Sequence, residues 1–325
     1  MGQLRMTVMF VCSFYKLKKD KSLPIERSDP IMESGFMRLS VLFASLLCLP
    51  FFANADLKQY VASLEESQWR VSGNNPVMCR LEHDIPSYGK AVFTSIAGKN
   101  HNLNFTLDMW VKPDQVTQAK LMSMAPAWRP GVVSKEITEL TYQKYFSGEV
   151  PRNAAWSMLA ELESGMQPTF YYADWYNQSN KIAVGLSAVN FRRQYAQFKS
   201  CLASLLPYSF EDIAFTVLTY ESGGTELTRY AKAQINKVQE YLAYDQNVDL
   251  VLIDAYTDSY GGRSANERVS VQRADSVKEL FVASGIPQSR IHTMGHGERR
   301  HVASNKTIDE RARNRRVVIR ISKPL

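Results

Sequence analysis

The sequence contains few of the residue types from which catalytic and metal sites are usually built. Its 325 residues include only four cysteines and five histidines. It has no Gly-x-Ser-x-Gly motif, no phosphate-binding loop and no His-Glu-x-x-His motif. His292 and His296 are four positions apart, but they fall on a predicted strand and a glycine-rich turn, not on one helix face, so they do not predict a metal site. We therefore expect a protein that is not an enzyme and needs no cofactor.

The sequence also lacks a strong excess of either charge sign. The formal net charge is +7, from 39 basic and 32 acidic residues. Residues 1–55 contain seven of the basic and four of the acidic residues, which leaves 32 against 28 in the rest of the chain. This mild balance does not indicate nucleic-acid binding. With the export signal described next, it leads us to expect no nucleic-acid partner.

The apolar run near the N-terminus is too short to cross a membrane as a helix. Leu39–Phe52 spans 14 residues, whereas about 20 are needed. Met37-Arg38 precedes the run and Ala53-Asn54-Ala55 follows it, which is typical of a signal peptide at residues 37–55. Cys48 follows the bulky Leu47, which does not suit a lipoprotein signal. We expect Met32 or Met37 to be the true start, and residues 1–36 to be a dispensable upstream or leader segment.

Only two cysteines, Cys79 and Cys201, follow the predicted signal peptide. An exported protein with two cysteines is expected to pair them, because the compartment is oxidising. The chain-entropy model gives about 4–5 kcal/mol of stabilisation for a loop of this length. We therefore predict a Cys79–Cys201 disulfide.

Residues 56–208 are predicted to form a β-rich domain with two helices. Alternating apolar residues from Leu103 to Met109 indicate a half-buried strand, and Thr169–Tyr172 and Ile182–Val184 indicate two more. Leu57–Trp69 is expected to begin as a helix and then become extended. The two helices are predicted at Ala154–Ser164, capped by Asn153, and at about Val189–Leu205, which carries Cys201.

Residues 209–325 are predicted to form an α+β domain with the order βαβαββ. The expected strands are Ala214–Tyr220, Val248–Ala255, Ile291–Met294 and Val317–Ile321. The expected helices are Glu226–Leu242 and Arg268–Ala283, with Gly285 at the end of the second. Phe210-Glu211-Asp212 is expected to be a connector.

One strand-loop-helix unit in this second domain carries a carboxylate and a guanidinium. Asp258 follows the predicted strand Val248–Ala255, and Arg273 is expected about one turn into the next helix. Such a pair can bind a ligand that has an ammonium and a carboxylate close together. An ion pair that only braces the loop is the alternative.

Residues around this unit resemble the OmpA-like family of peptidoglycan-binding domains over about residues 214–325. The matching positions are Tyr256-Thr257-Asp258, Asn266, Ser270, Arg273-Ala274, Gly295-His296-Gly297-Glu298, Asn305 and Asn314-Arg315-Arg316-Val317. In that family the corresponding aspartate and arginine hold the diaminopimelate of the peptidoglycan stem peptide. The resemblance therefore implies that Asp258 binds the ammonium and Arg273 the carboxylate. Thr257 and Asn266 would support the loop or the ligand, with Arg316 near the same mouth.

The first domain resembles the MotY family of the sodium-driven flagellar motor. The resemblance is carried by Cys79-x-Leu81-x-His83-x-Ile85-Pro86, Gly89, Ala91, Phe93, Ala173-Asp174-Trp175 and Ser187-Ala188-Val189. It implies a periplasmic component of the T ring around the flagellar basal body. It also implies association with MotX and recruitment of the PomA/PomB stator, with the first domain binding the basal body and MotX and the second binding the wall.

Two other functions remain open at this point. The chain could be a general envelope anchor that ties another complex to the cell wall. It could also be a wall-modifying enzyme that the second domain only targets. The acids available for such chemistry in the first domain are Asp108, Glu161 and Glu163, and nothing in the sequence organises them into a site.

Overall fold

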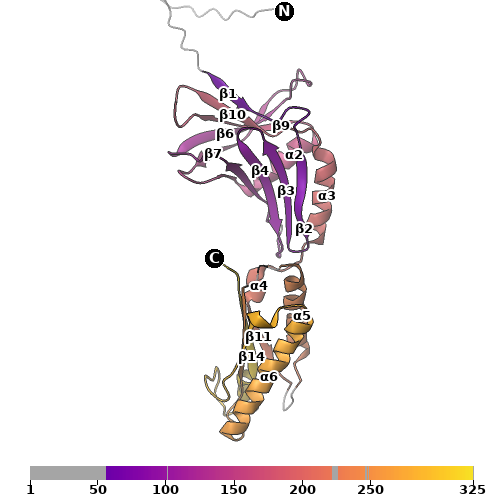
Figure 1. Cartoon of the computed structure of the whole chain (residues 1–325), viewed down its shortest axis with the longest axis vertical. Helices are drawn as coiled ribbons and strands as arrows, with labels where there is room; N and C mark the ends of the chain where they lie inside the picture. Colours follow the sequence, from indigo (N-terminus) through magenta and orange to yellow (C-terminus); the bar gives the residue numbers. More distant parts are fainter. Residues whose placement is uncertain (1–55, 101, 222–225, 246, 248, 325) are drawn as a thin grey trace, which may run out of the picture. The chain divides into compact units, whose positions relative to one another are not determined.

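The computed structural model describes residues 56–100, 102–221, 226–245, 247 and 249–324. The predicted leader at 1–36 and signal peptide at 37–55 lie outside these residues. The described strands form two five-stranded sheets between Leu57 and Gly185 and one four-stranded sheet between Phe215 and Ser322 (Figure 1). No helix in these parts of the chain is long and apolar enough to cross a membrane. The predicted fold class, a β-rich first half with two helices followed by an α+β second half, is confirmed.

The first sheet has the strand order β1-β10-β9-β6-β7. Its strands are β1 (Leu57–Tyr60), β6 (Thr117–Met124), β7 (Lys135–Tyr142), β9 (Gln167–Ala173) and β10 (Lys181–Gly185). β9 and β10 form an antiparallel pair, as predicted for these segments. The expected helical start at Leu57 is wrong, because β1 pairs in parallel with β10. One isolated helical turn is unstable, and pairing at the sheet edge satisfies the same backbone groups.

The second sheet is antiparallel, with the order β2-β3-β4-β5-β8. Its strands are β2 (Trp69–Asn75), β3 (Met78–Ile85), β4 (Gly89–Ile96), β5 (Asn104–Met109) and β8 (Gly148–Val150). The strand predicted from the alternation after Leu103 is β5. Its Phe105 stacks on Phe170 of β9 with the ring centroids 5.7 Å apart. The inner faces of the two sheets therefore share one apolar core.

Two helices complete this core. α2 (Arg152–Glu163) contributes Met158, Leu159 and Leu162, and α3 (Phe191–Ser204) packs against β2 and β3. The predicted cap at Asn153 is wrong. Pro151 occupies the N-cap position, and the fixed φ of proline suits a helix start, so α2 begins one residue before Asn153. α2 ends at Glu163 with Ser164 as its C-cap, and the predicted stop, Gly165, follows directly with a φ of 83°.

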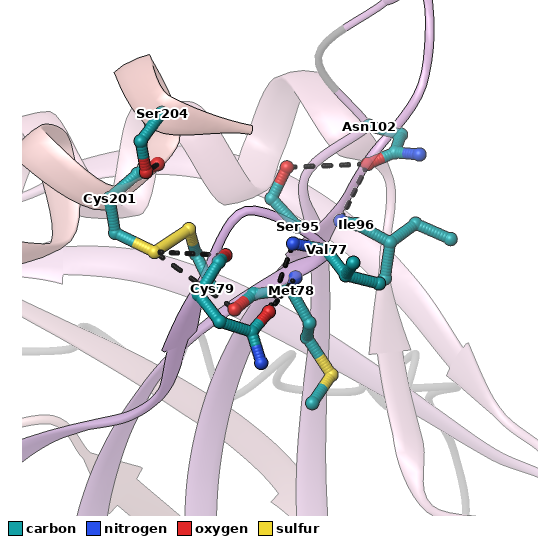
Figure 2. The surroundings of a disulfide bond; sticks show 9 residues. Val77, Met78, Cys79, Ser95, Ile96, Asn102, Cys201 and Ser204 are labelled. Atoms are coloured by element: carbon teal, nitrogen blue, oxygen red, sulfur yellow. Dashed lines mark hydrogen bonds between the residues drawn. A yellow bond between two sulfur atoms is a disulfide. The ribbon is translucent and has the colours of Figure 1, made fainter. Parts of the chain in front are cut away.

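The predicted disulfide joins Cys79 of β3 to Cys201 of α3. Both cysteines are buried. Figure 2 shows the bond beside the turn between β2 and β3, where Asn75 Oδ1 accepts hydrogen bonds from the backbone N–H groups of Val77 and Met78 at 2.9 Å. The disulfide thus attaches the C-terminal half of α3 to a turn that is itself hydrogen-bonded.

The third sheet has the order β11-β14-β12-β13. Its strands are β11 (Phe215–Thr219), β12 (Leu250–Tyr256), β13 (Ile291–Gly295) and β14 (Arg316–Ser322), and only β12 and β13 run parallel. The helices of this region are α4 (Phe210–Ala214), α5 (Arg229–Tyr244), α6 (Arg263–Ala283) and α7 (Ile308–Asn314), with a 3-10 turn at Gln288–Arg290. Apolar residues of the sheet, α5 and α6 form a second core cluster.

Several boundaries in this region differ from the sequence-based expectation. The predicted connector at Phe210 is a short helix, α4, with a capping box formed by Ser209 and Asp212. α6 begins at Arg263 and not at Arg268. The earlier start was missed because the first turn of the helix carries no apolar stripe. Arg273 therefore lies nearly three turns into α6, whereas one turn was expected. The short helix α7 stands between β13 and β14.

Candidate functional site

Asp258 lies in the loop between β12 and α6 and is almost fully buried. Its Oδ1 accepts a hydrogen bond from the backbone N–H of Tyr260 at 3.0 Å, which closes a local Asx turn. Its Oδ2 accepts from Nη1 of Arg315 at 2.8 Å. The carboxylate is thus held in one orientation by the loop and by a guanidinium from the end of α7.

Arg273 approaches the same loop from α6. Its guanidinium lies over the Tyr220 ring, 4.1 Å from the centroid. Burial lowers the pKa of Arg273, the neighbouring Arg315 lowers it further, and Tyr220 and Asp258 act in the opposite direction. Burial also raises the pKa of Tyr220 to about 12, so its phenol is neutral near pH 7. Two guanidiniums and one carboxylate therefore interact at this site, which gives a net positive charge.

Arg315 is a site residue that the sequence-based prediction did not include. Its side chain is 13% exposed. Within the described part of the chain, its Nε and Nη2 atoms have no hydrogen-bond partner. Buried polar atoms without a partner are costly, so a ligand that accepts hydrogen bonds here would be favoured.

Arg316, the arginine that was predicted, faces a different environment. Its guanidinium lies 4.0 Å from the centroid of the Tyr256 ring, and its Nη2 donates to the carbonyl oxygen of Arg300 at 3.0 Å. Successive residues of a strand point to opposite faces, and β14 begins at Arg316 opposite Tyr256. Arg315, just before the strand, is therefore the arginine that contacts Asp258.

Thr257 and Asn266 connect the Asp258 loop to its surroundings. The backbone N–H of Thr257 donates to the carbonyl of Gly297 at 2.8 Å. The buried Oγ1 of Thr257 has no hydrogen-bond partner among the described residues. Asn266 Nδ2 donates to the carbonyl of Asp258 at 3.3 Å and to Oε2 of Glu298 at 3.0 Å. Asn266 thus links the Asp258 loop to Glu298.

Two asparagines connect the Asp258 loop to α7 and to the segment that precedes it. The fully buried Asn314 accepts from the backbone N–H groups of Val302 and Ala303 and donates to Asn305 Oδ1. Asn305 Oδ1 in turn accepts from the backbone N–H of Ser259 at 3.2 Å. Both asparagines belong to the pattern that carries the OmpA resemblance. Their hydrogen bonds give them a structural role beside the Asp258 loop.

A glycine permits the close packing of α6 beneath the site. A Cβ atom at Gly295 would lie 2.6 Å from the backbone nitrogen of Val271, which real side chains do not tolerate. The helix that carries Asn266 and Arg273 can therefore lie against the end of β13 only if position 295 is a glycine.

The arrangement is suited to binding a ligand that carries both charge signs. Two arginines can bind a carboxylate, and Asp258 can accept from an ammonium. Among the described residues, no group of three or more His, Cys, Asp or Glu side chains could hold a metal ion. His296 Nε2 instead lies 2.7 Å from Oδ1 of Asp254.

The acids considered for a catalytic role in the first domain are each engaged in separate ion pairs. Glu161 contacts Lys135 and accepts from Ser123, and Glu163 pairs with Lys199 at 2.8 Å. Asp108 pairs with Lys112 at 2.6 Å. A hydrogen bond from Lys112 lowers the pKa of Asp108, which is opposite to what a general acid needs.

The fold and this site define a protein with an OmpA-type domain that follows a β-rich domain. Residues 219–315 match the OmpA family, and this match includes Asp258, Arg273 and Arg315. Residues 60–207 match the MotY N-terminal domain. The chain is 44% identical over 266 residues to the sodium-type flagellar protein MotY of Vibrio parahaemolyticus, covering 82% of this chain and 91% of the relative. The chain belongs to the MotY family.

Other relatives match a shorter part of the chain. The probable lipoprotein YiaD of Escherichia coli is 47% identical over 72 residues, which cover 22% of this chain and 33% of the relative. Among solved structures, the C-terminal domain of Helicobacter pylori MotB is 17% identical with a TM-score of 0.30, covering 34% of this chain and 85% of that chain.

Proposed function

We propose that the chain is a periplasmic structural component of the sodium-driven flagellar motor, part of the T ring, that anchors to peptidoglycan and helps to recruit the stator. The family membership supports the motor assignment, because the Vibrio parahaemolyticus relative is a sodium-type flagellar protein. The OmpA-family match supports the wall-binding assignment. In this proposal residues 56–208 bind the basal body and MotX, residues 209–325 bind the wall, and PomA/PomB is the stator that assembles around them.

The observation that carries the wall-binding function is the cluster of Asp258, Arg273 and Arg315. Diaminopimelate in an uncrosslinked stem peptide offers an ammonium beside a carboxylate. Asp258 would accept from the ammonium and Arg273 would donate to the carboxylate, while Arg315 has further buried donor atoms. Charge-assisted hydrogen bonds of this kind contribute about 1.5–3 kcal/mol each. Thr257 and Asn266 would hold the loop, and Arg316, which lies on the Tyr256 ring, would support the structure nearby.

Co-sedimentation with purified sacculi tests this site. We expect Asp258→Ala and Arg273→Ala each to reduce the bound fraction strongly, because each removes one of the two opposite charges that recognise the ligand. Arg268→Ala is the matched control, since Arg268 is an exposed residue of the same helix. Undiminished binding by both site variants would refute the proposed wall contact.

The motor assignment is tested in a deletion strain. We expect intact filaments without swimming, loss of PomB foci at the flagellar pole, and recovery of both by the wild-type chain. A strain that swims normally would favour the second candidate, a general envelope anchor. That candidate has support of its own, because the matching YiaD relative is a probable lipoprotein and others are outer-membrane proteins. Release of muropeptides by the purified protein would instead indicate a wall-modifying enzyme.

A further inference from the structure

A groove of about 1050 Å³ lies on the first domain, far along the sequence from the Asp258 site. It is bounded by the segment that leads into β2, the start of α3, and the loop that carries Trp128. Trp69, Leu162 and Phe191 are almost fully buried and line its floor. The Phe191 and Trp69 rings meet edge to face, with the centroids 4.9 Å apart. The floor is therefore part of the packed core, which supports the more exposed walls of the groove.

The groove has large apolar side chains on its walls as well. Trp128 and Leu64 are each 55% exposed and both line it. Exposed tryptophan is uncommon on a protein surface and is enriched where proteins bind one another. These walls are suited to bulky apolar side chains from a partner.

The rim of the groove is positively charged. Among the residues that the structure describes, its lining includes Arg70, Arg129, Arg192 and Arg193 and no aspartate or glutamate. Arg70 is paired with Asp84, but Arg129 and Arg192 are held by neutral groups. Arg129 Nη1 donates to the carbonyl of Ser164 at 2.5 Å, and Arg192 Nε donates to the carbonyl of Glu163 at 3.0 Å. A guanidinium has five N–H donors, so both arginines keep their charge and further donors for a ligand.

The walls are fixed in place by hydrogen bonds between distant parts of the chain. Trp69 Nε1 donates to the carbonyl of Ser187 at 2.9 Å, and Ser67 Oγ donates to that of Val189 at 3.0 Å. Asn190 Nδ2 donates to the carbonyl of Ser67 at 3.1 Å. A groove that is already ordered loses little conformational entropy on binding, which favours affinity.

We propose that this groove binds an acidic, extended segment of a partner protein that also carries bulky apolar side chains. The apolar floor and the walls at Trp128 and Leu64 would take the apolar side chains, and Arg129, Arg192 and Arg193 would pair with the carboxylates. Charge complementarity argues against a second copy of the same chain, because residues 56–325 are themselves weakly basic. The groove lies on the domain to which the proposed function assigns the motor contacts. The proposal does not depend on wall binding by Asp258 and Arg273.

A random 12-residue peptide library, displayed on phage and selected on the protein purified after export, tests the proposal. We expect the enriched peptides to place Asp or Glu beside Leu, Phe or Trp. A fluorescein-labelled copy of the most enriched peptide should bind Arg129→Glu/Arg192→Glu at least about tenfold more weakly, since two charge-assisted contacts are reversed. Its affinity for the wild type should fall with rising salt. Trp128→Ala should also weaken binding.

Matched variants separate the groove from general effects of charge or exposed aromatics. Arg152→Glu/Lys181→Glu reverses two exposed charges elsewhere on the domain, and Trp110→Ala removes another exposed tryptophan; both should bind the peptide normally. Arg129→Gln/Arg192→Gln removes the charges but keeps hydrogen-bond donors, and should give an intermediate affinity. All groove variants should retain sacculus binding, so failure of this proposal is distinguishable from failure of wall binding.

Three outcomes would overturn the proposal. The first is enrichment of neutral or basic peptides, or of none at all. The second is equal affinity of the acidic peptide for the wild type and for Arg129→Glu/Arg192→Glu. The third is a wild-type dimer in sedimentation velocity that Arg129→Glu/Arg192→Glu abolishes, which would assign the groove to self-association.

Discussion

Arg315 and Arg316 are adjacent and carry the same charge, yet their side chains have different partners. Arg315 contacts the carboxylate of Asp258, and two of its nitrogens have no hydrogen-bond partner within the described residues. Arg316 lies on the Tyr256 ring and donates to backbone carbonyls. Burial lowers the pKa of Arg316, while Tyr256 partly opposes this effect. The first environment is typical of ligand binding and the second of a structural contact.

We predict that substitution separates these two roles. Arg315→Gln should weaken binding of a diaminopimelate-containing stem peptide by about tenfold or more, because it removes a charged donor. Arg316→Gln should leave affinity nearly unchanged and lower the free energy of unfolding by about 1–3 kcal/mol, through lost ring and hydrogen-bond contacts. Isothermal titration calorimetry and urea unfolding of both variants measure the two effects. Equal loss of affinity in both would show that the division of roles is wrong.

The candidate site was partly predictable from sequence because its spacing is a family pattern. Asp258, Arg273 and Asn266 were identified in this way, and the structure brings all three to the same loop and helix. Arg315 was missed in favour of Arg316 because the choice depends on where β14 begins. A shift of one residue in a strand exchanges the two faces, and sequence patterns do not locate strand ends to one residue.

At the scale of elements, the third sheet carries a buried carboxylate, Asp254, that is hydrogen-bonded to side chains of its neighbours. Asp254 of β12 accepts from His296 at 2.7 Å and from Arg320 of β14 at 2.5 Å. Burial tends to raise the pKa of Asp254, but the hydrogen bonds from His296 and Arg320 outweigh it, and the pKa lies below its ordinary value of 3.8. The carboxylate thus links three strands, since His296 directly follows β13.

We predict that Asp254 contributes to stability in a pH-dependent way. A depressed pKa in the folded state means that the contribution is complete above pH 3.8 and is lost as pH falls through the lower folded value. Asp254→Asn should therefore lower the free energy of unfolding by about 1.5–3 kcal/mol at pH 7, with the difference from the wild type shrinking below about pH 4. Thermal unfolding between pH 3 and 7 measures this, with the exposed Asp249→Asn as control. A difference that stays constant across this range would contradict it.

Elements with a clear apolar period were predicted well, and elements defined by pairing or by polar turns were not. α3 and β5 follow their stripes of buried residues. β1 has no such pattern and exists because β10 offers it an edge. The first turn of α6 is polar. One of its residues, Asn266, is buried and donates a hydrogen bond to the carbonyl of Asp258. These features depend on contacts between distant segments, which periodicity does not report.

At the scale of the whole chain, the disulfide and the candidate wall-binding site belong to different core clusters. Cys79 and Cys201 lie in the cluster formed by the two five-stranded sheets with α2 and α3. The core beneath the Asp258 loop, which includes Ala255 and Ala274, belongs to the other cluster. Val77 and Ala97 of the first domain also belong to this second cluster, but neither cysteine does. The disulfide should therefore mainly stabilise the first domain, which carries the arginine-rimmed groove, and have little influence on ligand binding by the second.

We predict that Cys79→Ser/Cys201→Ser lowers the stability of the first domain while wall binding persists. The bond joins cysteines that are 122 positions apart. The chain-entropy model gives about 4–5 kcal/mol of stabilisation for a loop of this length. For a domain of this size that corresponds to a fall of roughly 10–15 °C in melting temperature. Differential scanning calorimetry measures the fall, and sacculus co-sedimentation at about 25 °C measures binding. Ser200→Ala, a substitution beside Cys201 on α3, is the control.

Loss of sacculus binding in the cysteine variant at a temperature where the second domain remains folded would show that the two domains are coupled through the disulfide-bonded core.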